Sequence, residues 1–429
     1  MKKIKKIEIR HGFWINVITL ASGSVVSQIL VFLTLPILTR IYTPGDFGIL
    51  ATFTSIVSIV SIVAALRYEL AIPLPENETI AANTTVLCLI NIVLISIVSG
   101  LGILLLSRWI IILKADIFKW LIPVGILGTG LYQVFTYWSI RRKYYNYLAR
   151  TKVIRSMGMV STQLGMGLTH FGVSGLLIGD VVGRICGSSG LIWQSWCKDK
   201  NIFNTVSCKG IKESAVLYRR FPIYLSAAGL LNTGAVYLPV LFLAGFWGHE
   251  VAGWFDFAQK TVLIPLSIIS QSTAQVYLGE AAKIVQENPQ SLRLLFYKTI
   301  KRLFIYGSIP IIILVLIAPM IFSFIFGEEW LEAGRYVQVL AVMFLADFIF
   351  TPVSPTLNIL NRQNWQLGWD GLRFLLTVLV FVLINTVKWS AYTAIALYGI
   401  LMIIFYIILG LLINKAIYIM ELDYEIYKR

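Results

Sequence analysis

Charged residues are scarce in this sequence of 429 residues. Asp, Glu, Lys and Arg together make up 13% of the chain, hydrophobic residues make up 58%, and the mean hydropathy is +0.79. A soluble globular domain needs a far more polar surface than this composition provides, so that class of protein is excluded. The sequence therefore predicts an all-α polytopic membrane protein.

Acidic residues are scarcer still, with 21 Asp and Glu against 36 Lys and Arg, which gives a formal net charge of +15. A basic balance of this size can indicate a nucleic-acid partner when the cations gather on one surface. Here, however, 28 of the 36 basic residues fall in alternate loops between apolar segments. This distribution is typical of a membrane topology signal, and we expect no nucleic-acid partner.

Cysteine and histidine are also rare, with four Cys and three His. Cys88, Cys186, Cys197 and Cys208 do not have the spacing of a metal site. The sequence contains no phosphate-binding Walker motif and no hydrolase nucleophile elbow. These absences favour a protein that is not an enzyme and that holds no metal or other cofactor.

We expect no cleavable signal peptide at the start of the chain. Lys2, Lys3, Lys5, Lys6 and Arg10 precede an apolar run that is too long for a signal peptide and ends without a small-residue cleavage site. We expect this first helix to remain as an uncleaved anchor.

Long apolar runs are what the chain has in abundance. A helix needs roughly 20 apolar residues to cross the ~30 Å of hydrocarbon in a bilayer. Twelve segments predict about twelve transmembrane helices, of which the fifth and eleventh are short or interrupted. The segments are 14–38, 47–66, 81–106, 118–139, 153–170, 173–196, 221–246, 250–278, 302–326, 336–360, 370–387 and 390–414.

The basic residues indicate the orientation of these segments. Short loops rich in Lys and Arg stay in the cytoplasm. Because the basic loops include both ends of the chain, we expect both termini to be cytoplasmic. The basic regions are 1–13, 67–80, 141–155, 196–221, 279–302, 359–373 and 415–429.

The longest of these loops divides the chain near its middle. We expect an N-terminal six-helix bundle at 1–200, a cytoplasmic linker loop at 201–220 and a C-terminal six-helix bundle at 221–429. A weak internal repeat, in which Pro and Arg positions recur, supports this division. Two like halves related by an axis along the membrane normal would place a central cavity between them.

The first predicted hairpin carries the most distinctive residues. Residues 36–48 read PILTRIYTPGDFG, in which Pro44, Gly45 and Asp46 supply a tight reversal between two apolar runs. One helix later, residues 67–75 read RYELAIPLP. Together these stretches resemble the opening of polysaccharide-biosynthesis membrane proteins. Those proteins are the Wzx-type O-antigen flippases of the superfamily that also includes the MATE exporters and the lipid II flippases.

That resemblance implies a MATE-like fold and a transport function. It implies that undecaprenyl-diphosphate-linked oligosaccharide repeat units are flipped from the cytoplasmic to the periplasmic leaflet of the bacterial inner membrane by alternating access. The expected partners are this lipid-linked oligosaccharide, membrane lipids, a glycan polymerase and a chain-length regulator. Because no ATPase motif is present, coupling to a H⁺ or Na⁺ gradient is our hypothesis for the driving force.

Two other functions stay open at this point. A MATE-like exporter of small cations would need an acidic cavity rather than a basic one. A membrane glycan polymerase or ligase would need a substantial periplasmic loop with catalytic groups, whereas the outward loops here are short. A lipid-tail groove between helices would favour flipping over both alternatives.

Charges within the apolar segments are candidates for substrate binding, because each costs about 2.5–3.5 kcal/mol to insert. Asp180 and Arg184 lie four residues apart in the sixth segment and share a helix face. Asp256 and Lys260 repeat this spacing in the eighth segment, next to aromatic residues that would suit sugar rings. Arg184 and Lys260 are therefore candidate cavity cations for a pyrophosphate or another anionic group. In the alternative interpretation, each pair neutralises itself and is structural.

Asp347 is a single acid well inside the tenth segment, with no cation within helical reach. Such an acid suits coupling to protons or sodium ions. A neutral acid that is hydrogen-bonded between helices is the alternative.

Several arginines lie near the ends of the apolar segments. Arg40 belongs to the family-like motif and is a candidate for headgroup capture, with snorkelling to the interface as the alternative. The others are expected around the cytoplasmic mouth, where most set topology and a few attract the diphosphate. This set is Arg67, Arg141, Arg142, Arg155, Arg362 and Arg373.

Overall fold

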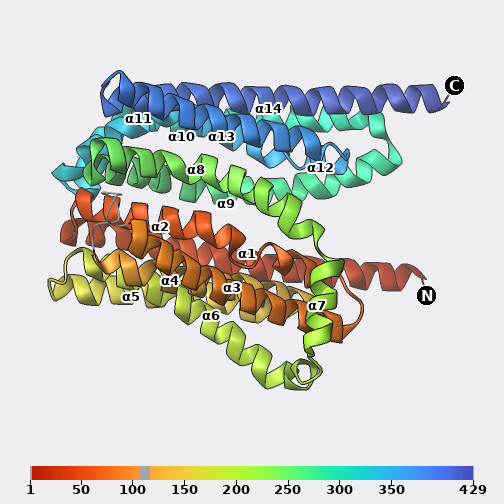
Figure 1. The fold of residues 1–429 in the computed structure, drawn as a ribbon. Coiled ribbons are helices and arrows are strands. Elements are labelled where there is room, and N and C mark those ends of the chain that lie inside the picture. Colours follow the sequence, from red (N-terminus) through yellow and green to blue (C-terminus); the bar gives the residue numbers. More distant parts are fainter. Residues whose placement is uncertain (1, 107–115, 429) are drawn as a thin grey trace. The chain divides into compact units, whose positions relative to one another are not determined.

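The computed structural model describes residues 2–106 and 116–428, and every regular element among them is a helix or a helical turn (Figure 1). Helices occupy all twelve of the apolar segments seen in the sequence. The all-α prediction is confirmed. The chain divides into two compact units, Met1–Thr233 and Gly234–Arg429, which we call unit 1 and unit 2.

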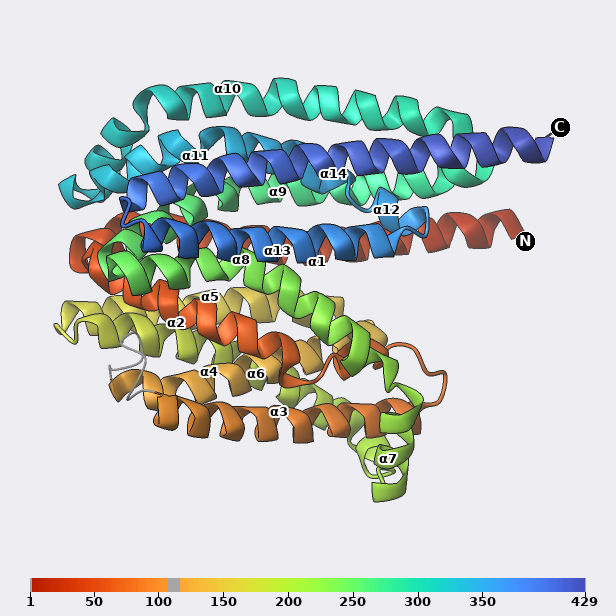
Figure 2. The same ribbon diagram turned by 45° about the horizontal axis from the view of Figure 1, so that its top comes forward.

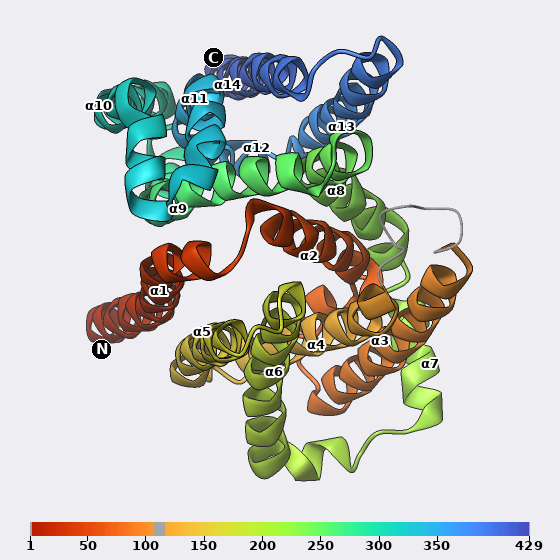
Figure 3. The same ribbon diagram turned by 90° about the vertical axis from the view of Figure 1, so that its left-hand side faces the viewer.

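Unit 1 consists mainly of long helices. They are α1 (Lys2–Ile41), α2 (Pro44–Ala64), α3 (Glu78–Leu106), α4 (Asp116–Arg141), α5 (Tyr145–Leu168), α6 (Val173–Phe203) and the short α7 (Cys208–Leu217), with a 3₁₀ turn, η1, at Tyr68–Ala71. Helix α5 packs against both α1 and α6, and α4 packs against α2, α3 and α6 (Figure 3). Unit 1 is therefore a bundle in which α4, α5 and α6 form the centre.

The reversal between α1 and α2 is closed by the residues that the sequence places there. Thr43 Oγ1 accepts a hydrogen bond from the backbone N–H of Asp46 at 3.2 Å, and Asp46 Oδ2 accepts one from the N–H of Thr43 at 3.0 Å. This capping box, with Pro44 at the first helical position, starts α2. The Tyr42 hydroxyl donates to the Gln163 carbonyl at 2.7 Å and holds the turn against α5. The predicted helical hairpin is confirmed.

Four glycines at intervals of four residues, Gly175, Gly179, Gly183 and Gly187, let α6 approach α5 closely. A Cβ atom on Gly183 would lie only 2.9 Å from the carbonyl oxygen of Arg155 on α5. Small residues at this spacing are the usual means of close helix packing in membranes. This contact holds α6, the helix that carries Asp180 and Arg184, in place against α5.

The segment 201–220, expected to be a linker loop, is largely helical. Ser207 caps α7 by accepting a hydrogen bond from the backbone N–H of Gly210 at 3.1 Å, and its own N–H donates to Asn83 Oδ1 at 3.1 Å. Helix α7 packs on α3 and runs across the direction of the longer helices of unit 1 (Figure 1). The segment thus belongs to unit 1, and the division between the units falls farther along the chain.

Unit 2 is organised around one central helix. Its elements are α8 (Ser226–Trp247), which begins in unit 1 after a π-helical turn at Phe221–Leu225, α9 (His249–Glu287), α10 (Leu292–Phe326), α11 (Leu331–Phe350), α12 (Thr356–Ile359), α13 (Gln363–Thr386) and α14 (Ala391–Lys428). Helix α11 packs on α9, α10 and α14, and α13 packs on α14 (Figure 2). The interior side chains of unit 2 therefore gather around α11.

Ten helices of the described ranges are long and apolar enough to cross a membrane. The two predicted spans outside this set correspond to α4 and α5, which are still helices of 26 and 24 residues. In α5, the polar residues Arg150, Lys152 and Arg155 lower the hydropathy of the first half. The fold is thus that of an all-α polytopic membrane protein, and spanning by α4 and α5 remains a prediction.

Candidate functional site

Asp180 and Arg184 form a buried ion pair on one face of α6. The Arg184 side chain is 7% exposed and that of Asp180 is 10% exposed, and Arg184 Nε donates to Asp180 Oδ2 at 2.5 Å. Arg184 Nη1 also donates to Thr129 Oγ1 on α4 at 2.6 Å. The guanidinium is therefore held between two helices of unit 1 by a carboxylate and a hydroxyl group.

The burial of this pair helps to decide whether Arg184 is a cavity cation or part of a self-neutralising structural pair. The charge of Arg184 is already neutralised by Asp180, and breaking such a buried pair would leave one charge uncompensated. The geometry therefore favours the structural interpretation. The role of Arg184 as a cavity cation stays a prediction.

Asp256 and Lys260 also pair, but in a more open setting. Lys260 Nζ lies 2.6 Å from Asp256 Oδ2, with the lysine side chain 44% exposed and the aspartate 13% exposed. The neighbouring rings of Phe255 and Phe257 are buried, and that of Phe257 lies 4.2 Å from the Trp330 ring between centroids. These two aromatic residues are thus core residues of unit 2 rather than open platforms for sugars, whereas the lysine side chain remains partly exposed.

Asp347 is a hydrogen-bonded carboxylate inside unit 2. Thr351 Oγ1 donates to Asp347 Oδ1 at 2.6 Å, and the Tyr406 hydroxyl on α14 makes a side-chain hydrogen bond with the same carboxylate. Tyr398, about two turns before Tyr406 on α14, is hydrogen-bonded to Gln259 of α9. Both tyrosines are buried. The acid predicted as the coupling residue thus has neutral hydroxyl partners from two neighbouring elements.

Arg373 lies inside unit 2 rather than at an exposed mouth. It is buried, its Nη2 lies 3.1 Å from Asp370 Oδ1, and its guanidinium lies 4.5 Å from the centre of the Trp369 ring. Arg373 and Asp347 both interact electrostatically with Tyr398. We therefore treat Asp347, Tyr398, Tyr406, Asp370 and Arg373 as one group, the unit 2 polar cluster.

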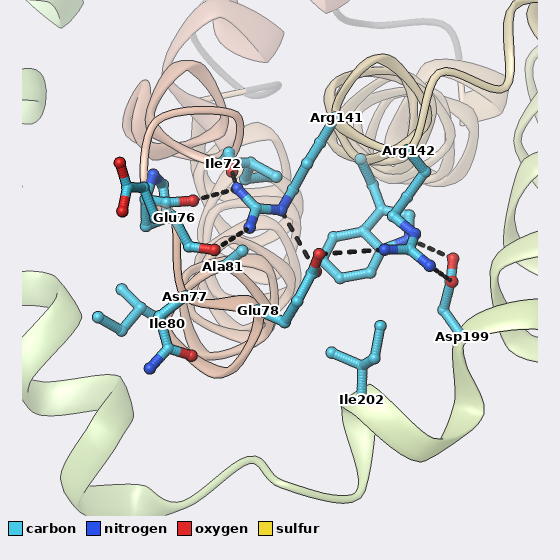
Figure 4. A network of polar contacts seen from close by, with 12 residues as sticks. Ile72, Glu76, Asn77, Glu78, Ile80, Ala81, Arg141, Arg142, Asp199 and Ile202 are labelled. Carbon is cyan, nitrogen blue, oxygen red and sulfur yellow. Dashed lines mark hydrogen bonds and ion pairs between the residues drawn. The ribbon is translucent and has the colours of Figure 1, made fainter.

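Arg141 fastens a loop to the end of α4. It donates to three backbone carbonyls, those of Ile72, Pro75 and Glu76 (Figure 4). Its Nε lies 3.5 Å from Glu78 Oε2 at the start of α3. Because the side chain is only 9% exposed, most of its donors are committed within unit 1.

Arg142 joins three helices of the same unit. It lies 3.1 Å from Glu78 of α3 and 3.0 Å from Asp199 of α6 (Figure 4). The Asp199 side chain is fully buried and also accepts hydrogen bonds from Trp138 Nε1 at 2.9 Å and from the Tyr144 hydroxyl at 3.3 Å. Arg142 thus links the starts and ends of α3, α4 and α6 through two carboxylates, which favours a structural interpretation, and its role at a cytoplasmic mouth stays a prediction.

Arg67 is tied to a buried acid by an unusual backbone. Leu66 and Arg67 have φ angles of 52° and 61°, a left-handed conformation that non-glycine residues rarely adopt. This bend brings Arg67 Nη1 to 3.7 Å from Glu69 Oε1, and Glu69 is 1% exposed. Burial raises the pKa of the Glu69 carboxyl above its ordinary value, which a backbone hydrogen bond and the Arg67 cation oppose.

The three remaining arginines are more accessible. Arg40 is exposed at the end of α1. Arg155 is half-buried with its guanidinium 5.4 Å from the centre of the Tyr132 ring, and Arg362 is half-buried with its guanidinium 5.5 Å from the centre of the Trp365 ring. Arg40 and Arg155 belong to unit 1 and Arg362 belongs to unit 2, and the roles expected for these three residues stay predictions.

The acids that accompany these arginines were not predicted from the sequence. Glu78 and Asp199 are far from their partners in the chain, and no sequence pattern reveals such pairs. Asp370 precedes Arg373 by three residues, which is a helical pairing distance that was available as a signal.

The sequence matches the profile of a known family. Residues 37–335 match the family described as "Polysaccharide biosynthesis protein", which is more than half of the chain. The chain belongs to this polysaccharide biosynthesis protein family. The membership confirms the resemblance seen in the first hairpin.

Named relatives of this polysaccharide biosynthesis protein are distant. The lipopolysaccharide biosynthesis protein WzxC of Escherichia coli (strain K12) is 27% identical over 32% of this chain and 28% of WzxC. The teichuronic acid biosynthesis protein TuaB of Bacillus subtilis (strain 168) is 25% identical over 46% of this chain and 40% of TuaB. The succinoglycan biosynthesis transport protein ExoT of Rhizobium meliloti (strain 1021) is 22% identical over 80% of this chain and 68% of ExoT. The alignments with WzxC and TuaB thus span less than half of those relatives.

Solved structures with the same fold are transporters. An inward-facing multidrug resistance MATE family transporter of the MOP superfamily has a TM-score of 0.60 at 15% identity, with 94% of each chain covered. A MATE protein in complex with MaL6 has a TM-score of 0.61 at 14% identity, covering 95% of this chain and 96% of the other. At these identities the likeness shows the fold alone, which is MATE-like.

Proposed function

We propose that this polysaccharide biosynthesis protein flips undecaprenyl-diphosphate-linked oligosaccharide units from the cytoplasmic to the periplasmic leaflet by alternating access. Family membership and the MATE-like fold support the proposal. The protein would act in the bacterial inner membrane with both termini in the cytoplasm. A glycan polymerase and a chain-length regulator would use the flipped product, and the chain itself would catalyse no reaction.

Lys260 is the observation that carries this proposal. It lies eleven residues beyond His249, the start of α9. At 1.5 Å per residue this is roughly 17 Å along the helix, about half of the hydrocarbon thickness. A charged side chain at this depth is costly unless it faces water, protein or an anion. Lys260 pairs with Asp256 at 2.6 Å, but unlike Arg184 its side chain is still 44% exposed. A cation in this position suits the passage of a diphosphate group.

We place the coupling of transport to a H⁺ or Na⁺ gradient at Asp347. A coupling acid must exist with and without its bound cation, and it therefore needs partners that tolerate both states. Thr351 and Tyr406 provide such hydroxyl groups. Replacement of this carboxylate by the isosteric amide in Asp347→Asn should then abolish the dependence of transport on the ion gradient.

Complementation of a bacterial strain that lacks its glycan-unit flippase tests the function. We expect the wild-type chain and Lys260→Arg to restore surface polysaccharide, and Lys260→Gln to fail at equal membrane abundance. Lys283→Gln is the matched control, because Lys283 forms an i,i+4 pair with Glu287 on the same helix, 3.5 Å apart and exposed. Full activity of Lys260→Gln would contradict the assignment of this cation.

A small-molecule exporter is the second candidate, because the solved structures with this fold include multidrug transporters. Accumulation of cationic dyes in cells expressing the chain separates the two functions. Dye efflux without restoration of surface polysaccharide would favour export over flipping.

A further inference from the structure

A groove lies within unit 2 between α9 and α10. Both helices pack more extensively on α11 than on each other, and the short turn Pro289–Ser291 connects them. The space that remains between them has a volume of about 600 Å³, and Phe348 of α11 forms part of its floor. The groove is thus built entirely from helices of one unit.

Two cations of α10 face this groove. Lys298 and Arg302 lie four residues apart and both line it. Neither forms an ion pair with any residue in the part of the chain that the structure describes. Like charges at this helical spacing repel each other, so an anion placed between them would relieve that repulsion. The pair therefore has the electrostatics of an anion site.

The distance of each polar lining residue from the connecting turn indicates its depth in the groove. Glu280 lies seven residues before the end of α9, and Lys298 lies six residues after the start of α10, so these two are at a similar level. Arg302 and Tyr277 are each ten residues from their helix ends, about one turn deeper. The deeper level thus has a cation without an acid opposite it, and the lining as a whole has a net charge of +1.

The apolar part of the groove continues beyond the two cations. Ile269, Leu303 and Phe348 contribute to its walls and floor. Helix α10 has 35 residues, whereas roughly 20 suffice to cross the hydrocarbon, so its ends extend toward the headgroups. Since the basic region 279–302 is expected on the cytoplasmic side, we expect Lys298 and Arg302 to lie near the phosphates of that leaflet. The groove would thus present its cations at the level of a phospholipid headgroup and its apolar walls at the level of the acyl chains.

We propose that the groove between α9 and α10 binds an anionic glycerophospholipid of the cytoplasmic leaflet, with its phosphate on Lys298 and Arg302 and an acyl chain along the apolar wall. The two cations lie about one helical turn apart on α10, within a single unit. This suits a lipid that stays in its leaflet, whereas a translocated substrate must move on to the other side. The proposal is therefore independent of the flippase function.

Native mass spectrometry of the purified full-length chain tests this site. The probes are phosphatidylglycerol and phosphatidylcholine of equal chain length. We expect preferential retention of phosphatidylglycerol, and about thirtyfold weaker binding by Lys298→Gln/Arg302→Gln, the loss expected for two cations at an anionic headgroup. Lys301→Gln is the matched control, since Lys301 is exposed on the same helix outside the groove lining. Glu280→Gln should strengthen binding, because it removes the acid.

Three outcomes would overturn the proposal. Equal retention of phosphatidylcholine would show that the phosphate charge is not recognised. An equal loss in Lys301→Gln would show that only the overall surface charge matters. Displacement of phosphatidylglycerol by undecaprenyl phosphate, one molecule for one, would assign the groove to the lipid-linked substrate instead.

Discussion

Arg373 and Asp370 show how unit 2 carries charge in its interior. Their side chains are 6% and 9% exposed, and the guanidinium also lies over the Trp369 ring. In such a pair each charge is stable only because the other is present. Removing one member leaves an uncompensated charge, while replacing both leaves apolar groups of similar size.

We predict that Arg373→Met lowers the free energy of unfolding by roughly 3–5 kcal/mol, and that Arg373→Met/Asp370→Leu recovers most of this loss. Denaturant titration of the purified protein measures both. The control is Arg335→Met, which breaks the i,i+3 pair with Glu332 whose side chains are 53% and 35% exposed. An exposed pair contributes about 0–1 kcal/mol. A double variant as unstable as the single one would contradict the prediction.

Glu69 should make stability depend on pH. Burial raises the pKa of its carboxyl above the ordinary value of 4.5, so the folded state holds the proton where the unfolded chain has lost it. Its contribution to stability is complete below pH 4.5 and is lost as the pH rises through the folded-state pKa. Glu69→Gln should therefore flatten the decline of the melting temperature above pH 4.5.

Melting curves across that pH range measure the effect. The matched control is Glu213→Gln, because the Glu213 side chain is 68% exposed and also pairs with a basic residue. Equal pH slopes for wild type and Glu69→Gln would rule out this explanation.

At the scale of elements, the contact between α5 and α6 depends on the glycines of α6. The Asp180–Arg184 pair lies on the same helix, and its hydrogen bond to Thr129 requires α6 to keep its position. A Cβ atom on Gly183 would meet the Arg155 carbonyl, a backbone atom that cannot rotate away.

Gly183→Ala should therefore destabilise the protein by about 1–3 kcal/mol, the usual cost of overpacking. Gly165→Ala, on the facing helix, is the control, because a Cβ there meets nothing within 4 Å. Denaturant titration of both variants distinguishes local packing from a general intolerance of alanine. Equal stability of the two variants would mean that the close approach is not needed.

At the scale of the whole molecule, hydropathy was sufficient to locate every long helix. The hairpin turn at Thr43 was also predictable, because its capping residues are adjacent in the chain. The Asp180–Arg184 and Asp256–Lys260 pairs were predictable as well, because the two partners of each pair lie four residues apart on one helix.

Contacts between distant segments were not predictable in this way. The arginines of the basic loops were expected mostly to set topology, and the contact of Arg142 with Asp199 forms only after the helices pack. The contact of Arg184, in the sixth apolar segment, with Thr129 likewise depends on helix packing. The helical character of 201–220 was missed because α7 is short and polar, and its start depends on the Ser207 cap. The sequence therefore predicted which helices carry charge, but not how many of those charges the structure neutralises.

The most direct test of the account is lipid flipping in proteoliposomes that contain the purified chain and a fluorescent undecaprenyl-diphosphate-linked oligosaccharide. We predict that the wild-type chain moves the substrate between leaflets, and that Lys260→Gln lowers the initial rate about tenfold or more, the loss expected for one charge-assisted contact. Lys283→Gln should keep the wild-type rate. No flipping by the wild-type chain, or equal rates for wild type and Lys260→Gln, would contradict the account.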